Sequence, residues 1–234
     1  STGSYLYNES AQAYSSSGGF SMSFWLKTEK TTMTGSFNVT NDRIILDSYD
    51  SSNKRAIYLK INSSPTSSLQ TQTWLQFGAH DNTAKCSEWG WRIHSNRLED
   101  YRRGGFYTLT WGGDFATDPE LYRNAVLQSK TVFDYQKYHS GGSGLSRKRI
   151  QKLYLLNSRP TSGSNPLMGS LNDVALWETE LDQNTITEIY NSGSNFNIDT
   201  TVSASALTDY WQLGQEGILT SSLVPHDPIP RLLI

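Results

Sequence analysis

The chain has 234 residues and a formal net charge of −2 at pH 7, with 36% hydrophobic and 18% charged residues. Such a length suits one domain, and so small a charge provides no overall attraction for nucleic acid. No stretch has the length and apolarity of a membrane span, and no signal peptide is recognised, so neither a nucleic acid nor a membrane is expected as a partner. The single cysteine, Cys86, cannot form an intrachain disulfide. Abundant Ser, Thr, Asn and Gly, with 7 Trp and 13 Tyr, indicate a β-protein with polar turns.

The first strands are predicted from alternating apolar residues in the N-terminal third. Residues 20–27 place four apolar side chains on one face and serines, Trp25 and Lys27 on the other. An apolar run at residues 43–48 and a strand at 55–61 are joined by a turn at 50–54, which predicts a hairpin. Residues 63–72, which include Pro65, are expected to form a polar loop.

The middle of the chain predicts further strands that are rich in aromatic residues. These strands are expected at residues 74–79, 89–94 and 105–111. A strand is also expected at 120–126, with Asn124 and Ala125 in the turn that reverses the chain. Another strand is predicted at 150–156, after a Gly- and Ser-rich connection.

The segment from Gly169 to Gly193 predicts one strand followed by one short helix. The strand carries apolar residues on both faces, which is typical of a strand buried within a sandwich. Asp182 is expected to cap the helix and Gly193 to end it. Asp173 is expected to hydrogen bond a nearby loop. A last strand at 207–213 and a Pro-containing tail from about residue 214 complete one domain over residues 1–234, and the tail is expected to cross the surface or contact a neighbour.

Four motifs carry a resemblance to a known family. F-S-M-S-F-W-L-K-T, G-F-Y-T-L-T-W-G-G-D, L-Y-R-N-A-V-L and G-S-L-N-D-V-A-L-W resemble strands of the laminin-G-like branch of the concanavalin A-like superfamily. The resemblance implies an all-β antiparallel sandwich, a jelly roll with one short helix near the C-terminus. L-T-D-Y-W-Q-L-G is similar to a strand that the family often places first. Its place after the helix resembles the order in laminin-G-like structural proteins of marine tailed phages.

That order predicts a non-enzymatic virion structural protein, such as a capsid decoration, neck or tail-fibre module. Its partners would be other virion proteins and further copies of itself, on the virion surface or otherwise on an extracellular surface. The alternative is a carbohydrate-binding adhesion module, which would bind glycans. A glycoside hydrolase is the weakest alternative, because the E-x-D-x-x-E carboxylate pattern of the superfamily's glycosidases is absent. The chain is therefore expected not to be an enzyme.

Two sets of residues are candidate binding sites. Sugars bind aromatic faces beside polar groups, and the candidates of this kind are Trp89, Trp91, Glu88 and Arg92. Core packing is the alternative for the tryptophans. No cofactor is required, but calcium remains an option because relatives hold it with carboxylates at the sandwich rim. The candidate ligands are Asp47, Asp50, Asp81 and Asp114, with turn capping as the alternative.

Overall fold

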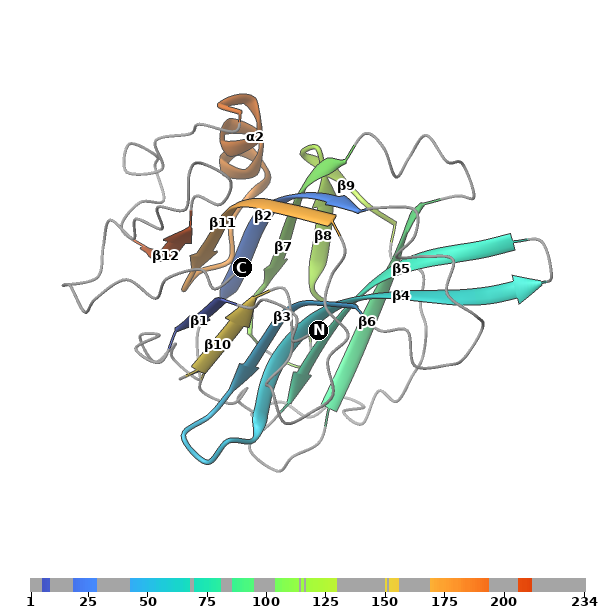
Figure 1. Cartoon of the computed structure of the whole chain (residues 1–234). Helices are drawn as coiled ribbons and strands as arrows, with labels where there is room; N and C mark the ends of the chain where they lie inside the picture. Colours follow the sequence, from blue (N-terminus) through green and yellow to red (C-terminus); the bar gives the residue numbers. More distant parts are fainter. Residues whose placement is uncertain are drawn as a thin grey trace.

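In the computed structural model the chain forms two antiparallel β-sheets packed face to face (Figure 1). The structure describes residues 6–8, 19–28, 43–67, 70–80, 86–94, 104–113, 115, 117–129, 150, 152–155, 169–193 and 206–211. Within these ranges lie twelve strands and one helix. The predicted all-β sandwich with one short helix is therefore confirmed, whereas the Pro-containing tail from about residue 214 lies outside the described residues.

Sheet A has the strand order β1-β10-β3-β4-β5-β6. Its strands are β1 (Leu6–Asn8), β10 (Lys152–Leu155), β3 (Arg43–Tyr49), β4 (Arg55–Ser67), β5 (Gln70–His80) and β6 (Cys86–His94). The predicted loop at residues 63–72 is instead largely strand, because β4 and β5 continue to pair as far as Ser67 and Gln70. Figure 1 shows this end of the hairpin projecting beyond the sandwich.

Sheet B has the strand order β12-β11-β2-β7-β8-β9. Its strands are β12 (Leu207–Trp211), β11 (Gly169–Trp177), β2 (Phe20–Thr28), β7 (Gly105–Trp111), β8 (Glu120–Arg123) and β9 (Val126–Leu127). Asn124 and Ala125 form the turn between β8 and β9 with φ of 52° and 60°. This is the positive-φ geometry of a tight hairpin, as the sequence predicts.

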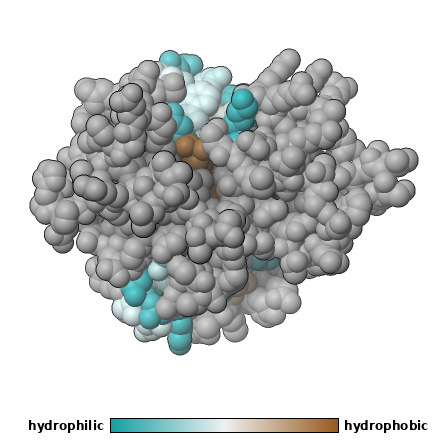
Figure 2. Space-filling model, in the orientation of Figure 1, coloured by the Kyte–Doolittle hydropathy of each residue, from teal (hydrophilic) through white to brown (hydrophobic). Residues whose placement is uncertain are grey.

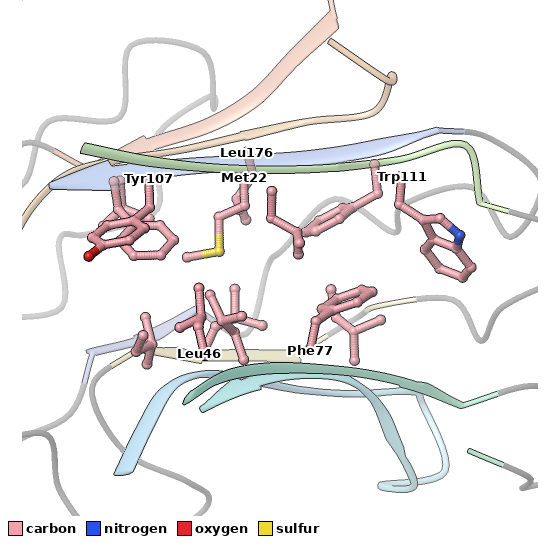
Figure 3. Packing of buried hydrophobic residues seen from close by; sticks show 14 of the residues in the cluster. Met22, Leu46, Phe77, Tyr107, Trp111 and Leu176 are labelled. Carbon is pink, nitrogen blue, oxygen red and sulfur yellow. The ribbon is translucent and has the colours of Figure 1, made fainter. Parts of the chain in front are cut away.

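The main core lies between the two sheets. Alternate residues of each strand point inward, so that Met22, Tyr107, Trp111 and Leu176 of sheet B face Leu46 and Phe77 of sheet A (Figure 3). Each such side chain contributes about 1.5–3 kcal/mol when fully buried. This core holds the sandwich together without an intrachain disulfide, since the chain has one cysteine.

A second apolar cluster covers the outer face of sheet B. Helix α2 (Gln183–Asn191) begins after Asp182, whose Oδ1 accepts a hydrogen bond from the backbone N–H of Thr185 at 2.8 Å. It ends before Gly193, at φ 74°. Ile186 and Ile189 pack with Leu181 and with Phe106, Trp177 and Leu207 of the sheet. No helix within the described ranges is both long and apolar enough to cross a membrane.

Candidate functional site

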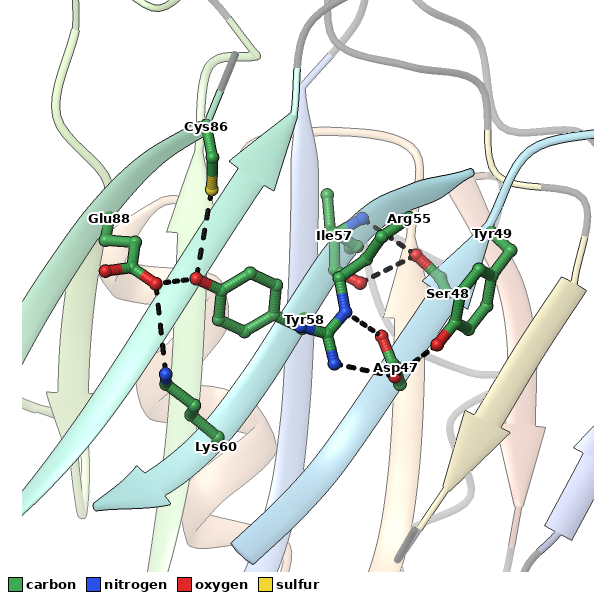
Figure 4. A network of polar contacts seen from close by, with 9 residues as sticks. All are labelled: Asp47, Ser48, Tyr49, Arg55, Ile57, Tyr58, Lys60, Cys86 and Glu88. Carbon is green, nitrogen blue, oxygen red and sulfur yellow. Dashed lines mark hydrogen bonds and ion pairs between the residues drawn. The ribbon is translucent and has the colours of Figure 1, made fainter. Parts of the chain in front are cut away.

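The outer face of sheet A carries a group of charged and aromatic side chains on β3, β4 and β6. We call this group the polar cluster. Its members are Asp47, Tyr49, Arg55, Tyr58, Lys60, Cys86 and Glu88 (Figure 4). Hydrogen bonds, ion pairs and ring contacts join them into one network, so their relative positions are set by one another as well as by the strands.

Two β-bulges place the members of the cluster on one face. On β3, Ile45 is the extra residue between the pairs Ile44–Lys60 and Leu46–Leu59. On β4, the extra residue lies between the pairs Asp47–Tyr58 and Tyr49–Arg55, where Ser48 bonds both the N–H and the C=O of Ile57 at 2.9 Å. Residues three apart in a regular strand lie on opposite faces. Because a bulge absorbs one residue, Arg55 and Tyr58 share a face.

The strand register forms a row across four strands of sheet A. Asp47 is paired with Tyr58, Tyr58 with Gly78, and Gly78 with Glu88. The ring of Tyr58 lies over Gly78, where any Cβ would overlap the ring atoms. Glycine at this position therefore allows the tyrosine to lie flat across β5 and reach β6.

Asp47 and Arg55 form a two-point ion pair at one end of this row. The Arg55 Nε and Nη2 atoms donate to the two Asp47 carboxylate oxygens at 2.7 and 2.8 Å, and the Tyr49 hydroxyl donates to Asp47 Oδ2 at 2.8 Å. Burial acts to lower the pKa of Arg55, but the hydrogen bonds and charge of Asp47 outweigh it, so the pKa is raised. Arg55 is therefore a permanent, firmly held cation.

Tyr58 connects this pair to the other end of the row. Its hydroxyl donates to Glu88 Oε1, and Lys60 Nζ lies 3.8 Å from the same oxygen. The cations of Arg55 and Lys60 lie 4.5 and 5.3 Å from the centroid of the Tyr58 ring, within the range of cation–π attraction. Cys86 Sγ is 3.8 Å from the Tyr58 hydroxyl.

The charged ends of the cluster reach the surface, but its centre does not. Asp47 is fully buried and Tyr58 is buried, whereas the side chains of Arg55 and Glu88 are 34% and 27% exposed. In Figure 2 hydrophilic residues are visible at the lower edge, where Figure 1 places the turn between β3 and β4. Polar groups that are held in this way lose little side-chain entropy when another molecule contacts them.

Three of the four predicted sugar-binding residues have described side chains, and these lie on two faces of β6. Trp89 and Trp91 point into the core, with 5% and 1% exposure, and the Trp89 ring packs 5.8 Å from Phe77. This burial supports the core-packing alternative for both. Glu88 lies on the opposite, outer face because side chains alternate along β6. Arg92 belongs to β6, but its side chain lies outside the described part.

Of the four predicted calcium ligands, only Asp47 and Asp50 lie within the described residues. Both oxygens of Asp47 are occupied by Arg55 and Tyr49. Asp50 Oδ1 accepts from the backbone N–H groups of Ser52 and Lys54, which is the turn-capping alternative. Asp81 and Asp114 lie outside the described residues. Among the residues that are described, no three His, Cys, Asp or Glu side chains form a potential metal site.

Asp173 differs from the expectation that it would bond a loop. It lies in a bulge of β11 with φ 46°, and its Oδ1 accepts a hydrogen bond of 3.2 Å from Tyr210 of the neighbouring strand β12. Its Oδ2 has no hydrogen-bond partner within the described structure. Burial raises the pKa of Asp173 from 3.8 to about 6, although the bond from Tyr210 acts in the opposite direction.

Comparisons with known proteins give structural neighbours only. No family model matches the chain, and no curated protein matches it. The botulinum neurotoxin serotype G binding domain is 14% identical, with a TM-score of 0.51 over 80% of this chain and 39% of that one. The serotype D binding domain is 17% identical, with a TM-score of 0.50 over 82% of this chain and 41% of that one.

A third neighbour covers more of the chain. It is described as a candidate carbohydrate-binding protein of Bacteroides ovatus, and it is 12% identical with a TM-score of 0.50 over 94% of this chain and 53% of that one. This chain therefore spans about half or less of the length of these three proteins. The likenesses show the fold. They do not show the laminin-G family or a phage origin.

Proposed function

We propose that the chain is a glycan-binding module without enzymatic activity, and that its contact surface is the polar cluster on sheet A. The observation that carries the proposal is the network of Figure 4, in which the charged groups are fixed by a buried core of Asp47 and Tyr58. Sugar sites use a few polar groups held in place by their surroundings. The names of the structural neighbours, which include a candidate carbohydrate-binding protein and two binding domains, support the same function.

The geometry of the cluster favours binding over hydrolysis. The backbones of Asp47 and Glu88 are three strands apart in the row. At about 4.8 Å per strand this corresponds to roughly 14 Å between the backbones. The two carboxylates of a glycosidase stand about 5–9.5 Å apart, with the substrate between them. In this protein the Tyr58 ring occupies the space between the two carboxylates, so they do not form a pair of that kind.

A virion structural role remains the prediction of the motif order in the sequence, and the structural neighbours do not support it. An adhesion module displayed outward on a particle would satisfy both functions. In either case the proposal places the outer face of sheet A toward the ligand and the module on an exposed surface.

A glycan array tests the proposal with the purified chain and one matched pair of variants. Gly78→Ala displaces the Tyr58 ring without changing any charge. We expect the wild type to bind a defined glycan class and Gly78→Ala to bind it at least about tenfold more weakly. Gly112→Ala is the control, because its Cβ would meet the flexible end of Glu180 at 3.3 Å and the Thr117 hydroxyl at 3.6 Å, and neither belongs to the polar cluster. Equal binding by Gly78→Ala and the wild type would exclude this surface, and the absence of any binding would exclude the function.

A further inference from the structure

Arg55 is held in a fixed orientation that leaves one edge of its guanidinium open. A guanidinium carries five N–H donors in a planar fork. The Nε and Nη2 edge is bound to Asp47, which is fully buried and braced by Tyr49. The remaining donors are the two on Nη1 and the second on Nη2. Within the described part of the chain, no acceptor is bound to Nη1.

The Arg55 side chain is partly exposed to solvent. The side chain of Arg55 is 34% exposed, and its guanidinium carbon is 4.5 Å from the centroid of the Tyr58 ring. Asp47 and Tyr58 therefore limit its rotation. The Nη1–Nη2 edge forms a ready pair of parallel donors.

The charges around this edge favour an anion. The described side chains of sheet A and its β3–β4 turn include four basic residues and three acidic ones. The basic residues are Lys54, Arg55, Lys60 and Lys152, and the acidic ones are Asp47, Asp50 and Glu88. Each acidic group is already engaged: Asp47 by Arg55, Asp50 by the backbone of its turn, and Glu88 by Tyr58 and Lys60.

We propose that Arg55 recognises a carboxylate or sulfate group of an acidic saccharide through its open edge. This inference rests on the proposed glycan-binding function and names the ligand class. A guanidinium has donors only, so it matches a pair of anionic oxygens better than a neutral hydroxyl. Charge-assisted bonds of this kind are roughly twice as strong as neutral ones.

The binding test compares acidic saccharides with neutral ones of similar length. A galacturonate oligosaccharide and sialyllactose carry carboxylates, a heparin oligosaccharide carries sulfates as well, and maltohexaose and lactose are neutral. Titration calorimetry at low and high salt should show at least one acidic saccharide binding about tenfold or more tighter than its neutral counterpart. Its affinity should fall as salt increases. Binding of the carboxylate probes, or of heparin alone, distinguishes the two anionic groups.

Three variants assign the effect to Arg55. Arg55→Lys retains the charge but loses the planar fork, and should weaken acidic saccharides about tenfold or more. The double variant Arg55→Gln/Asp47→Asn removes both charges together, so no buried carboxylate is left without a partner, and it should show the same loss. Lys27→Gln, an exposed cation of sheet B, is the charge-matched control and should bind as the wild type does. Circular dichroism and thermal melts confirm that each variant is folded.

The outcomes separate the two proposals. Binding of neutral saccharides alone, or full retention of acidic binding by Arg55→Lys and the double variant, would overturn the role of Arg55 and leave the glycan-binding function intact. Absence of binding to every saccharide would overturn both.

Discussion

The outer faces of the two sheets are organised in opposite ways. On sheet B, helix α2 covers the face and buries Trp177 and Ile186 completely. On sheet A, the described outer side chains form a network of ions and rings whose tips reach solvent. One face is closed by apolar packing, and the other is held rigid by polar contacts.

The difference indicates that sheet A is not organised for stability alone. A partly buried ion pair such as Asp47–Arg55 often contributes no more than apolar residues of the same volume would, because both charges lose water on folding. Burial of apolar side chains like those beneath α2 stabilises directly. The fixed orientation of the polar cluster is therefore consistent with the proposed recognition role, which does not depend on a gain in the free energy of folding.

The largest expected effect is on the closed face. Trp177→Ala should lower the free energy of unfolding by about 3–5 kcal/mol, because it leaves a cavity beneath α2. Urea denaturation measures the loss. Val126→Ala is the control, because Val126 is 62% exposed and should change stability by less than about 0.5 kcal/mol. If the two variants unfold at the same urea concentration, the outer face of sheet B is not closed as described.

Asp173 gives sheet B an unusual dependence on pH. Its folded pKa of about 6 exceeds its ordinary value of 3.8, so the folded state binds a proton more tightly than the unfolded state. The free energy of unfolding should therefore fall as pH rises from about 4 to about 6, by about 2 kcal/mol after allowance for solvent screening. Asp173→Asn should remove this fall, and asparagine tolerates the positive φ of this position.

Urea denaturation of wild type and Asp173→Asn across pH 4 to 7 (~0.5-unit steps) tests this. The two curves should differ most at the upper end, where the variant is the more stable protein. Parallel curves over the whole range would show that burial does not raise the pKa of the Asp173 carboxyl group.

A smaller effect is expected at the start of α2. Asp182→Ala removes the bond to the backbone of Thr185 and should cost about 1 kcal/mol. The hydrogen bond from the backbone of Thr185 lowers the pKa of Asp182. The contribution of Asp182 to stability is therefore present near neutral pH and is lost as pH falls through the lowered folded pKa, opposite in sign to that of Asp173. Thermal melts at pH 7 measure it, with Asp182→Asn as the control that retains a capping side chain. An equal loss in both variants would argue against capping.

The sequence predicts most elements of the fold because their signals are local. The alternation in β2 and the caps Asp182 and Gly193 depend on residues close together in the chain. The direction of each face of β6 cannot be predicted from nearby residues. Alternation identifies two faces of the strand but does not say which one is buried. Trp89 and Trp91 therefore had two interpretations until β6 was placed beside β5.

The polar cluster depends on pairing between strands, which composition and spacing do not reveal. Two signals were nevertheless present. Arg55 occupies what would be an inward position if the alternation of Ile57, Leu59 and Ile61 were extended back by one step. The continuous run of Ile44, Ile45 and Leu46 does not fit a regular two-faced strand. The position of Arg55 marks the bulge on β4, and the apolar run marks the bulge on β3.

The two bulges have a consequence for how such a surface can arise. The extra residue on β3 shifts the pairing with β4 by one position, and the extra residue on β4 shifts it back before the turn at Asp50. The two extra residues thus compensate one another in the strand register. Either alone would misalign the hairpin, whereas both together leave its ends in register and change only the row between them. Deleting one residue from each strand would therefore change the alignment of the cluster and leave the two ends of the hairpin paired as they are.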